Sequence, residues 1–216
     1  MRVTTMTLPS LALRTCATLA LLALPAAAEP RAPAPPPAAV SDGLTDQDRD
    51  LRDAADQLAG DAAQVMEQWL ATKAIAEDRL FSRLYFPIPK TDPVKYATPY
   101  DQLADRFLVP VEDKALNHTP TVEQYAIVTD VNGYVPAHNT RFTQPATGQP
   151  DKDYLNNRTK RMLGDPASLR AARSEARFLL QRIELETGDV IYDLSVPITI
   201  RGKHWGCARI GYRRAE

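Results

Sequence analysis

Three basic residues in the second half of the chain are of the types that bind anions. Arg158, Lys160 and Arg161 lie within the short segment NRTKR. Guanidinium groups match carboxylates and phosphates through paired hydrogen bonds, so this spacing predicts a clamp for an anionic ligand. Arg158 and Arg161 are its expected contacts. A solvated basic surface is the alternative interpretation, because runs of charge are often simply exposed.

Further candidate ligand contacts lie outside this segment. His138 and Asn139 are adjacent, and imidazole and amide edges pair well with carboxylate, amide or purine groups. A loop histidine that ties down the backbone is the alternative. Asp193 could receive a ligand amine, or it could form a cross-strand ion pair with Arg182. Tyr134 is a candidate aromatic wall, although strand aromatics are usually part of the core.

Sequence motifs of enzymes and of metal centres are missing from the chain. G-x-S-x-G, H-E-x-x-H and a glycine-rich phosphate loop do not occur, and His118, His138 and His204 are dispersed. C-x-x-C-H is also absent, which excludes covalent c-type haem by motif. We therefore expect a non-enzymatic protein with no metal and no cofactor. An unrecognised hydrolytic site and non-covalent haem are the alternatives left open.

The composition is that of a globular protein without a nucleic-acid partner. The chain has 216 residues, of which 44% are hydrophobic and 25% charged. Its 26 Lys and Arg residues nearly balance its 27 Asp and Glu residues, for a formal net charge of -1. Proteins that bind nucleic acids present a strongly basic footprint, so we set that class aside.

The N-terminal segment has the three parts of a secretory signal peptide. Arg2 gives the segment its charged start, and residues 15–24 form a short apolar run. Residues 25–28 (PAAA) then supply the small residues at which a signal peptidase cuts. Residues 1–28 are therefore a predicted signal peptide, and the mature chain is expected to be periplasmic or secreted. An uncleaved anchor is the alternative. The mature chain then keeps Cys207 alone, so no internal disulfide is expected.

A proline-rich linker, 29–43, separates this segment from a single predicted domain, 44–216. Apolar residues at helical spacing predict one long N-terminal helix over 44–84. Such a stripe usually packs on a core, and a coiled-coil dimer through the helix is the alternative. Its members are Leu51, Ala55, Leu58, Ala62, Val65, Trp69, Thr72 and Ala76, continued roughly by Leu80 and Leu84.

The second half of the chain changes to the period of two that is typical of strands. Strands are predicted at 122–129, from Tyr134, and at 178–186, 189–200 and 204–213, with a helix from Asp165 to Ser174. If two-residue turns join the last three strands, one face is nearly all apolar and packs on the long helix. That face carries Ile183, Leu194, Cys207 and Arg209, among others. Asp193 and Thr199 lie on the other, mixed face. The fold class is α+β, with the helix packed on a roughly five-stranded antiparallel sheet.

Five segments together resemble the extracytoplasmic Cache sensory domains of methyl-accepting chemotaxis proteins. The resemblance implies a PAS-like fold with a small-molecule pocket, and a role in chemotaxis or other signal transduction. In those receptors a membrane helix and a cytoplasmic coiled coil follow the domain. This chain ends at Glu216, so a separate membrane receptor is an expected partner. The matching segments are YFPIPKTDP (85–93), TDVNGYVPAHN (129–139), NRTKR (157–161), DLSVPI (193–198) and HWGCARIGY (204–212).

These observations favour an exported, non-enzymatic sensor module that binds a small molecule of anionic or amino-acid-like chemistry. The expected ligand contacts are Tyr134, His138, Asn139, Arg158, Arg161 and Asp193. The alternative is a ligand-free interaction module that forms a homodimer through its long helix.

Overall fold

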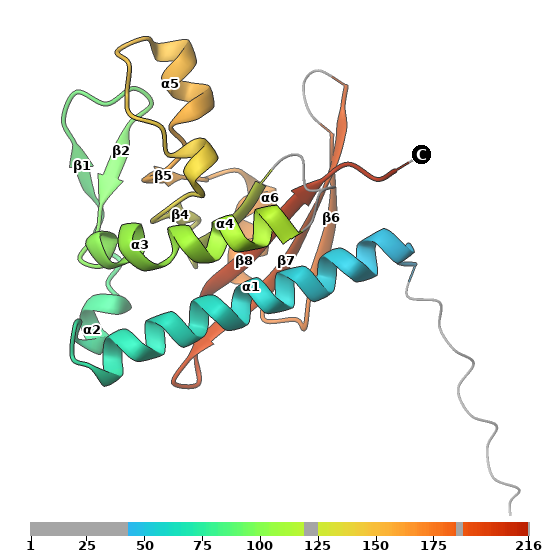
Figure 1. Cartoon of the computed structure of the whole chain (residues 1–216), viewed down its shortest axis with the longest axis horizontal. Coiled ribbons are helices and arrows are strands. Elements are labelled where there is room, and N and C mark those ends of the chain that lie inside the picture. Colours follow the sequence, from blue (N-terminus) through green and yellow to red (C-terminus); the bar gives the residue numbers. More distant parts are fainter. Residues whose placement is uncertain (1–42, 119–124, 185–187, 216) are drawn as a thin grey trace, which may run out of the picture. The chain divides into compact units, whose positions relative to one another are not determined.

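A computed structural model describes residues 43–118, 125–184 and 188–215, and its helices and strands are drawn in Figure 1. The predicted signal peptide (1–28) and nearly all of the proline-rich linker (29–43) lie outside the described residues. So do the first residues of the strand predicted over 122–129, and the predicted turn at 187–188 is described only in part.

The N-terminal helix α1 (Asp46–Ala71) begins where a capping box closes its first turn. Thr45 accepts a hydrogen bond from the Asp48 amide, and the Asp48 carboxylate accepts one from the Thr45 amide. The predicted apolar stripe is buried against the sheet and is therefore not available as a coiled-coil seam. Of its predicted members in α1, five are buried, and Met66 and Leu70 are buried beside them; the five are Leu51, Ala55, Leu58, Ala62 and Trp69.

The helix is shorter than the predicted range of 44–84. It ends at Ala71, and Lys73 adopts a left-handed backbone with φ of 57°. The Ala74 amide then donates to the Trp69 carbonyl, which reverses the chain. The helical spacing continues in the sequence, but Leu84 is 63% exposed. The later apolar residues therefore belong to other elements rather than to one continuous stripe.

The remaining helices and strands follow α1 along the chain. In chain order they are α2 (Glu77–Leu80), β1 (Phe86–Ile88), β2 (Lys95–Ala97), α3 (Asp101–Phe107), α4 (Val109–His118), β3 (Tyr125–Asp130), β4 (Tyr134–Val135), η1 (Thr140–Phe142), α5 (Pro150–Asn156), β5 (Arg161–Met162), α6 (Pro166–Arg173), β6 (Leu179–Glu184), β7 (Val190–Ile200) and β8 (Lys203–Tyr212).

The main sheet is antiparallel with the order β3-β8-β7-β6, and α1 packs across β7 and β8 (Figure 1). The α+β class with a long N-terminal helix on an antiparallel sheet is confirmed. The main sheet has four strands rather than about five. The strand predicted from Tyr134 is β4, which pairs with β5 in a separate two-stranded sheet.

The predicted face assignment is right for β7 and wrong for β6 and most of β8. Leu194 and Ile198 face α1, as expected, but Leu180 rather than Leu179 is paired with Leu194. The reason is the connection from Glu184 to Val190, which has five residues instead of two. The β6 side chains Leu179, Gln181 and Ile183 therefore face away from the helix.

A β-bulge in β8 reverses which of its later side chains face α1. Ile198 is paired with Gly206, whereas Thr199 is paired with His204, so Trp205 is an extra residue on β8. Trp205 itself packs in the helix-side core and donates its indole N–H to the Leu80 carbonyl at 3.1 Å. Beyond the bulge, Cys207 and Arg209 lie on the far face of the sheet rather than on the apolar one.

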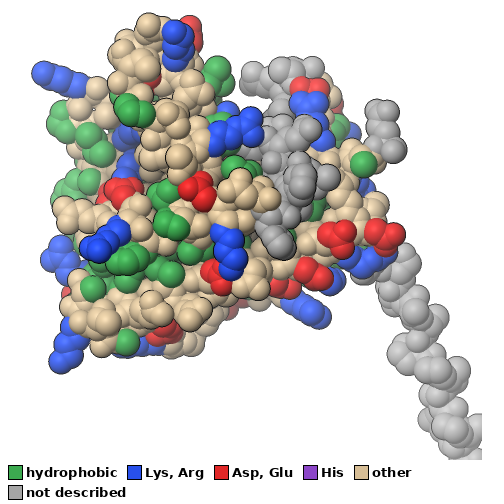
Figure 2. All heavy atoms as spheres, viewed as in Figure 1, with side chains coloured by type: hydrophobic (Ala, Val, Ile, Leu, Met, Phe, Trp, Pro, Cys, Tyr) green, Lys and Arg blue, Asp and Glu red, His purple; other side chains and the backbone are tan. Residues whose placement is uncertain are grey.

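Acidic and basic side chains are interspersed on the face shown in Figure 2, as a net charge near zero suggests. Among the described residues, no helix is both long and apolar enough to cross a membrane.

Candidate functional site

A cavity of about 550 Å³ lies between the far face of the main sheet and a covering layer formed by β4, β5, α5 and α6. Its volume is in the range typical of small-molecule sites. The sheet supplies Tyr125, Ile127, Ile183, Ile191 and Arg209, and the covering layer supplies Val135, His138, Tyr154, Arg158, Arg161, Leu163, Asp165 and Ser168.

A glycine in β8 allows an aromatic side chain to lie against the sheet wall. Tyr125 in β3 is paired with Gly211, and a Cβ atom at Gly211 would come within 2.4 Å of the Tyr125 ring. The ring therefore occupies the space that any other residue at 211 would fill. The Tyr125 hydroxyl donates to the Asp193 carboxylate at 2.9 Å.

Arg209 is buried in the sheet wall and is only 2% exposed. Its Nε and Nη2 donate to the two carboxylate oxygens of Asp193 at 3.1 and 3.0 Å. Burial alone would lower the pKa of Arg209, but the Asp193 carboxylate outweighs it and raises the pKa above its usual value. The guanidinium is therefore permanently charged. Its Nη1 has no hydrogen-bond partner among the described residues.

Two more arginines lie in the covering layer. Arg161 donates through Nη2 to three backbone carbonyls at the end of α5, those of Asp153, Tyr154 and Asn157. Arg158 donates through Nε to the Leu155 carbonyl at 2.9 Å. Within the described part of the chain, neither arginine forms an ion pair with a carboxylate.

Burial lowers the pKa of both Arg158 and Arg161. The Arg161 Nε is also buried without a partner among the described residues. Both side chains are partly held by aromatic rings, with Arg158 4.2 Å from the centroid of Phe142 and Arg161 4.8 Å from that of Tyr154. The cavity therefore presents positive charge that no described acid neutralises at this end.

His138 completes the basic end of the cavity as a neutral group. It is 3% exposed and packs edge-on against Phe142, with the ring centroids 5.0 Å apart. Burial, reinforced by the charges of Arg158 and Arg161, lowers the pKa of His138 to about 3. Its Nδ1 has no partner in the described structure. A neutral imidazole here can offer one hydrogen bond to a ligand without competing for its charge.

The structure brings three of the six predicted site residues together, namely His138, Arg158 and Arg161. Asn139 is next to this group and fully buried, but it does not line the cavity, and its amide atoms have no described partner. Lys160, the third basic residue of the predicted clamp, instead pairs with Asp105 at 2.7 Å.

The other two predicted contacts lie outside the cavity lining. Asp193 lies behind Arg209, and its strand neighbour in β6 is Gln181, not Arg182. It forms a structural ion pair, which was the alternative interpretation, although the partner differs. Tyr134 lies in the core, where its hydroxyl is 2.9 Å from both the Asp101 carboxylate and the Tyr96 carbonyl, either of which can accept its proton.

Sequence reasoning missed Arg209, the most buried basic group of the site. The strand that contains Arg209 was predicted, and its side chains were expected to alternate between the two faces of the sheet. The bulge at Trp205 places Arg209 on the opposite face to the one that simple alternation predicts. Tyr125 and Asp165 were missed as well. Asp165 was recognised only as a helix start, and it does cap α6 by accepting from the Ser168 amide at 2.9 Å.

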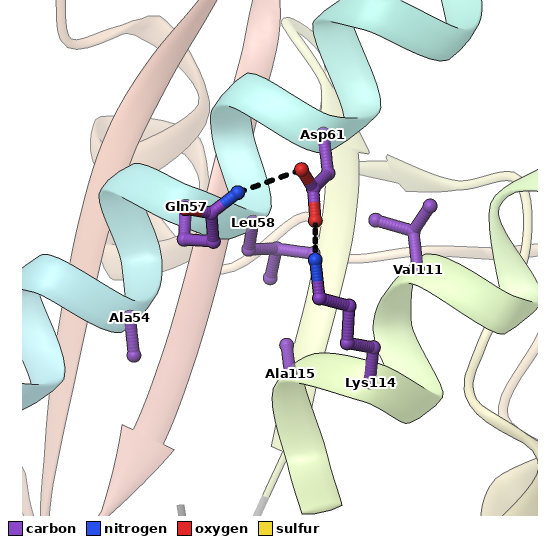
Figure 3. Close-up of a pocket in the computed structure, with 7 residues that line it drawn as sticks. All are labelled: Ala54, Gln57, Leu58, Asp61, Val111, Lys114 and Ala115. Carbon is purple, nitrogen blue, oxygen red and sulfur yellow. Dashed lines mark hydrogen bonds and ion pairs between the residues drawn. The ribbon is translucent and has the colours of Figure 1, made fainter. Parts of the chain in front are cut away.

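A second, smaller hollow of about 210 Å³ lies between α1 and α4 (Figure 3). Its polar side chains satisfy one another. Lys114 donates to Asp61 at 2.7 Å, and Gln57 donates to the same carboxylate at 2.7 Å. Ala54, Leu58, Val111 and Ala115 supply the apolar floor. Because these polar groups are already paired, the hollow has fewer unpaired hydrogen-bonding groups for a ligand than the cavity on the far face of the main sheet.

Groups suited to nucleophilic or metal chemistry are scarce around the cavity. Cys207 is fully buried, and burial raises the pKa of its thiol to about 12. Ser195 is also buried, and its hydroxyl is 3.4 Å from the Leu179 carbonyl. In the described parts of the chain no three His, Cys, Asp or Glu side chains are grouped to hold a metal ion. The arrangement can bind and orient an anion.

No family model matches this chain, and no curated protein matches it. One solved structure with a detectable likeness is an extracellular ligand binding receptor from Desulfohalobium retbaense DSM5692. The identity is 13%, the TM-score is 0.34, and the match covers 79% of this chain. It covers 26% of that chain, so this protein spans about a quarter of the receptor's length. Relation to the Cache domains stays a prediction.

Proposed function

We propose that this protein is a non-enzymatic binding module for small anionic molecules, with its site in the cavity beneath the main sheet. One observation carries the proposal: Arg158, Arg161 and Arg209 line one cavity, and two of these three guanidinium groups have no carboxylate partner among the described residues. A bound anion would supply the missing counter-charge.

Desolvation makes such an arrangement costly in the absence of a ligand. A buried donor without a partner loses its hydrogen bonds to water and gains none in return. The Arg161 Nε and the Arg209 Nη1 are in this state in the described structure, and the His138 Nδ1, which donates in one of the two neutral tautomers, also has no partner there. A carboxylate, phosphate or sulfonate can accept several such hydrogen bonds at once. Binding therefore offsets a cost that the folded protein already carries.

We further propose that the module acts outside the cytoplasm, as a sensor of the Cache type that presents its ligand-bound state to a membrane receptor. The signal-peptide pattern over 1–28 and the segments that resemble Cache domains support this extension. N-terminal sequencing of the exported protein tests the location. A mature chain that starts at Glu29 is expected, and retention of residues 1–28 in the cytoplasm would contradict it.

Binding itself is tested by thermal shift followed by isothermal titration calorimetry. The panel contains carboxylates, phosphates and sulfonates, and each is compared with a neutral amide of the same carbon skeleton. Anions that bind the site raise the melting temperature by mass action, and the amides do not. A panel in which no anion shifts the melting temperature would overturn the proposal.

A pair of arginine variants then locates the site. Arg158 and Arg141 both stack on the Phe142 ring, but only Arg158 lines the cavity, and Arg141 is exposed. Arg158→Ala is expected to weaken anion binding about ten-fold or more, since a hydrogen bond to a charged group is lost. Arg141→Ala is the matched control and is expected to leave affinity unchanged. Equal losses in the two variants would place the site elsewhere.

A further inference from the structure

We infer that the ligand of this cavity is an amphiphilic monoanion, in which a compact anionic head is joined to an aliphatic body. The inference rests on the proposed binding function and specifies its ligand class. It follows from two features of the walls: the cationic groups are interleaved with aliphatic side chains, and the charges of the site leave room for a single negative charge.

Aliphatic side chains lie beside the cationic groups on both walls. In the sheet, Ile183 of β6 is directly paired with Ile191 of β7, and Ile127 of β3 is directly paired with Arg209 of β8. In the covering layer, Val135 is paired with Arg161 across β4 and β5, and Leu163 follows β5. All of them line the cavity.

A small hydrophilic anion would contact only the basic groups and leave the part of the cavity between these aliphatic side chains unfilled. An aliphatic body fills that space, and each of its methylenes that leaves water contributes a roughly constant free energy. Converted to affinity, this corresponds to about a three- to four-fold gain per methylene. The cavity volume of about 550 Å³ accommodates a body of several methylenes.

The charge balance of the walls favours one negative charge over two. The charged groups of the lining are Arg158, Arg161, Arg209 and Asp165, and both Asp165 and Asp193, which lies behind the lining, interact with Arg209. His138 is uncharged because burial and the neighbouring arginines lower its pKa to about 3. Three cations against two carboxylates leave one positive charge. A monoanion neutralises it, whereas a dianion brings an unpaired charge into a partly apolar cavity.

Isothermal titration with straight-chain carboxylates tests this inference on the full mature chain. The probes are acetate, butanoate, hexanoate and octanoate, with succinate, inorganic phosphate and octanamide as comparisons. Affinity is expected to rise by about three- to four-fold per methylene along the series. Hexanoate is expected to bind more tightly than succinate or phosphate, and octanamide is expected to bind more weakly than octanoate.

Two variants separate the head from the body. Arg158→Ala should weaken acetate and octanoate by the same factor and leave the gain per methylene unchanged. Ile183→Thr removes apolar surface while it keeps a β-branched strand residue, and should reduce the gain per methylene without weakening acetate. Ile88→Thr is the matched control, because Ile88 is a partly buried strand residue of β1 that does not line the cavity.

The possible outcomes distinguish this inference from the proposed function. If acetate and octanoate bind equally well, or if succinate or phosphate binds more tightly than hexanoate, the amphiphilic class is wrong and the anion site stands. If octanamide matches octanoate, the anionic head is wrong. If none of the anions binds, the proposed function fails together with the inference.

Discussion

The Arg209 guanidinium lies against the Asp193 carboxylate through two hydrogen bonds of 3.1 and 3.0 Å, and both side chains are almost completely buried. Tyr125 and Gln181 donate to the same carboxylate from the neighbouring strands β3 and β6. One ion pair on β7 and β8 is thereby held by all four strands of the sheet. The same ion pair fixes the position of Arg209, which is the cavity arginine that the sheet supplies.

Removal of one partner of this pair should be far more costly than removal of an exposed ion pair. Asp193→Ala leaves the Arg209 charge buried and unpaired, and is expected to lower the free energy of unfolding by about 3–5 kcal/mol. Glu184→Ala, which removes the exposed partner of Arg182 on the same sheet, should cost about 0–1 kcal/mol. Urea denaturation measures both. Similar losses in the two variants would contradict a structural role for the buried pair.

The two faces of β7 can be distinguished by introducing the same charge on each. Leu194 is fully buried against the helix-side core, whereas Thr199 on the opposite face is exposed. An unpaired buried carboxylate costs several kcal/mol, which is comparable with the ~5–15 kcal/mol that stabilises a whole domain. Leu194→Asp should therefore unfold the protein, and Thr199→Asp should retain a cooperative transition by circular dichroism. Comparable melting temperatures would be inconsistent with this packing.

Local patterns were sufficient to predict much of the fold. The apolar stripe indicated α1, and the period of two indicated β7 and β8, because both signals depend on residues close together in the chain. The end of α1 was not predictable from spacing, since the reversal at Lys73 depends on a left-handed residue that is not glycine.

The candidate site was harder to predict because its two walls are joined by long-range register. His138, Arg158 and Arg161 were expected to contact one ligand, and the pairing of β4 with β5, which was not predicted, brings their segments together. Arg209 was assigned to the wrong face because a single extra residue, Trp205, changes which side of the sheet it faces. Gly206, which follows Trp205, is the one local signal for that bulge, because a glycine inside a strand often lies at a bulge or at a close approach of two backbones.

The two arginines of the covering layer should differ in their effect on stability. One Arg161 nitrogen donates to three backbone carbonyls at the end of α5, whereas Arg158 makes one such bond. Arg161→Ala leaves these acceptors without their partner, and is expected to destabilise the ligand-free protein by about 1–3 kcal/mol. Arg158→Ala should shift the melting temperature less. A ligand-free melting temperature unchanged by Arg161→Ala would show that Arg161 serves the ligand alone.

His138 should make the folded protein sensitive to mild acid. Its pKa is lowered from 6.5 to about 3 on folding, so between these values the unfolded chain binds a proton that the folded protein does not. The stability that depends on neutral His138 is therefore complete above pH 6.5 and is lost as the pH falls toward 3. The expected slope is about 1.4 kcal/mol per pH unit.

Replacement of the imidazole by a group that does not titrate isolates this contribution. In His138→Gln the amide keeps a polar group at the position but binds no proton in this range, so the loss of stability on acidification should be shallower than in the wild type. Urea denaturation at about pH 7 and about pH 4.5 is expected to show a difference between the two proteins of on the order of 3 kcal/mol. The carboxylates of the chain are common to both proteins, so their titration cancels in the comparison. Parallel pH profiles for the two proteins would mean that His138 accepts a proton in the folded state, and the neutral histidine at the basic end of the cavity would then be wrong.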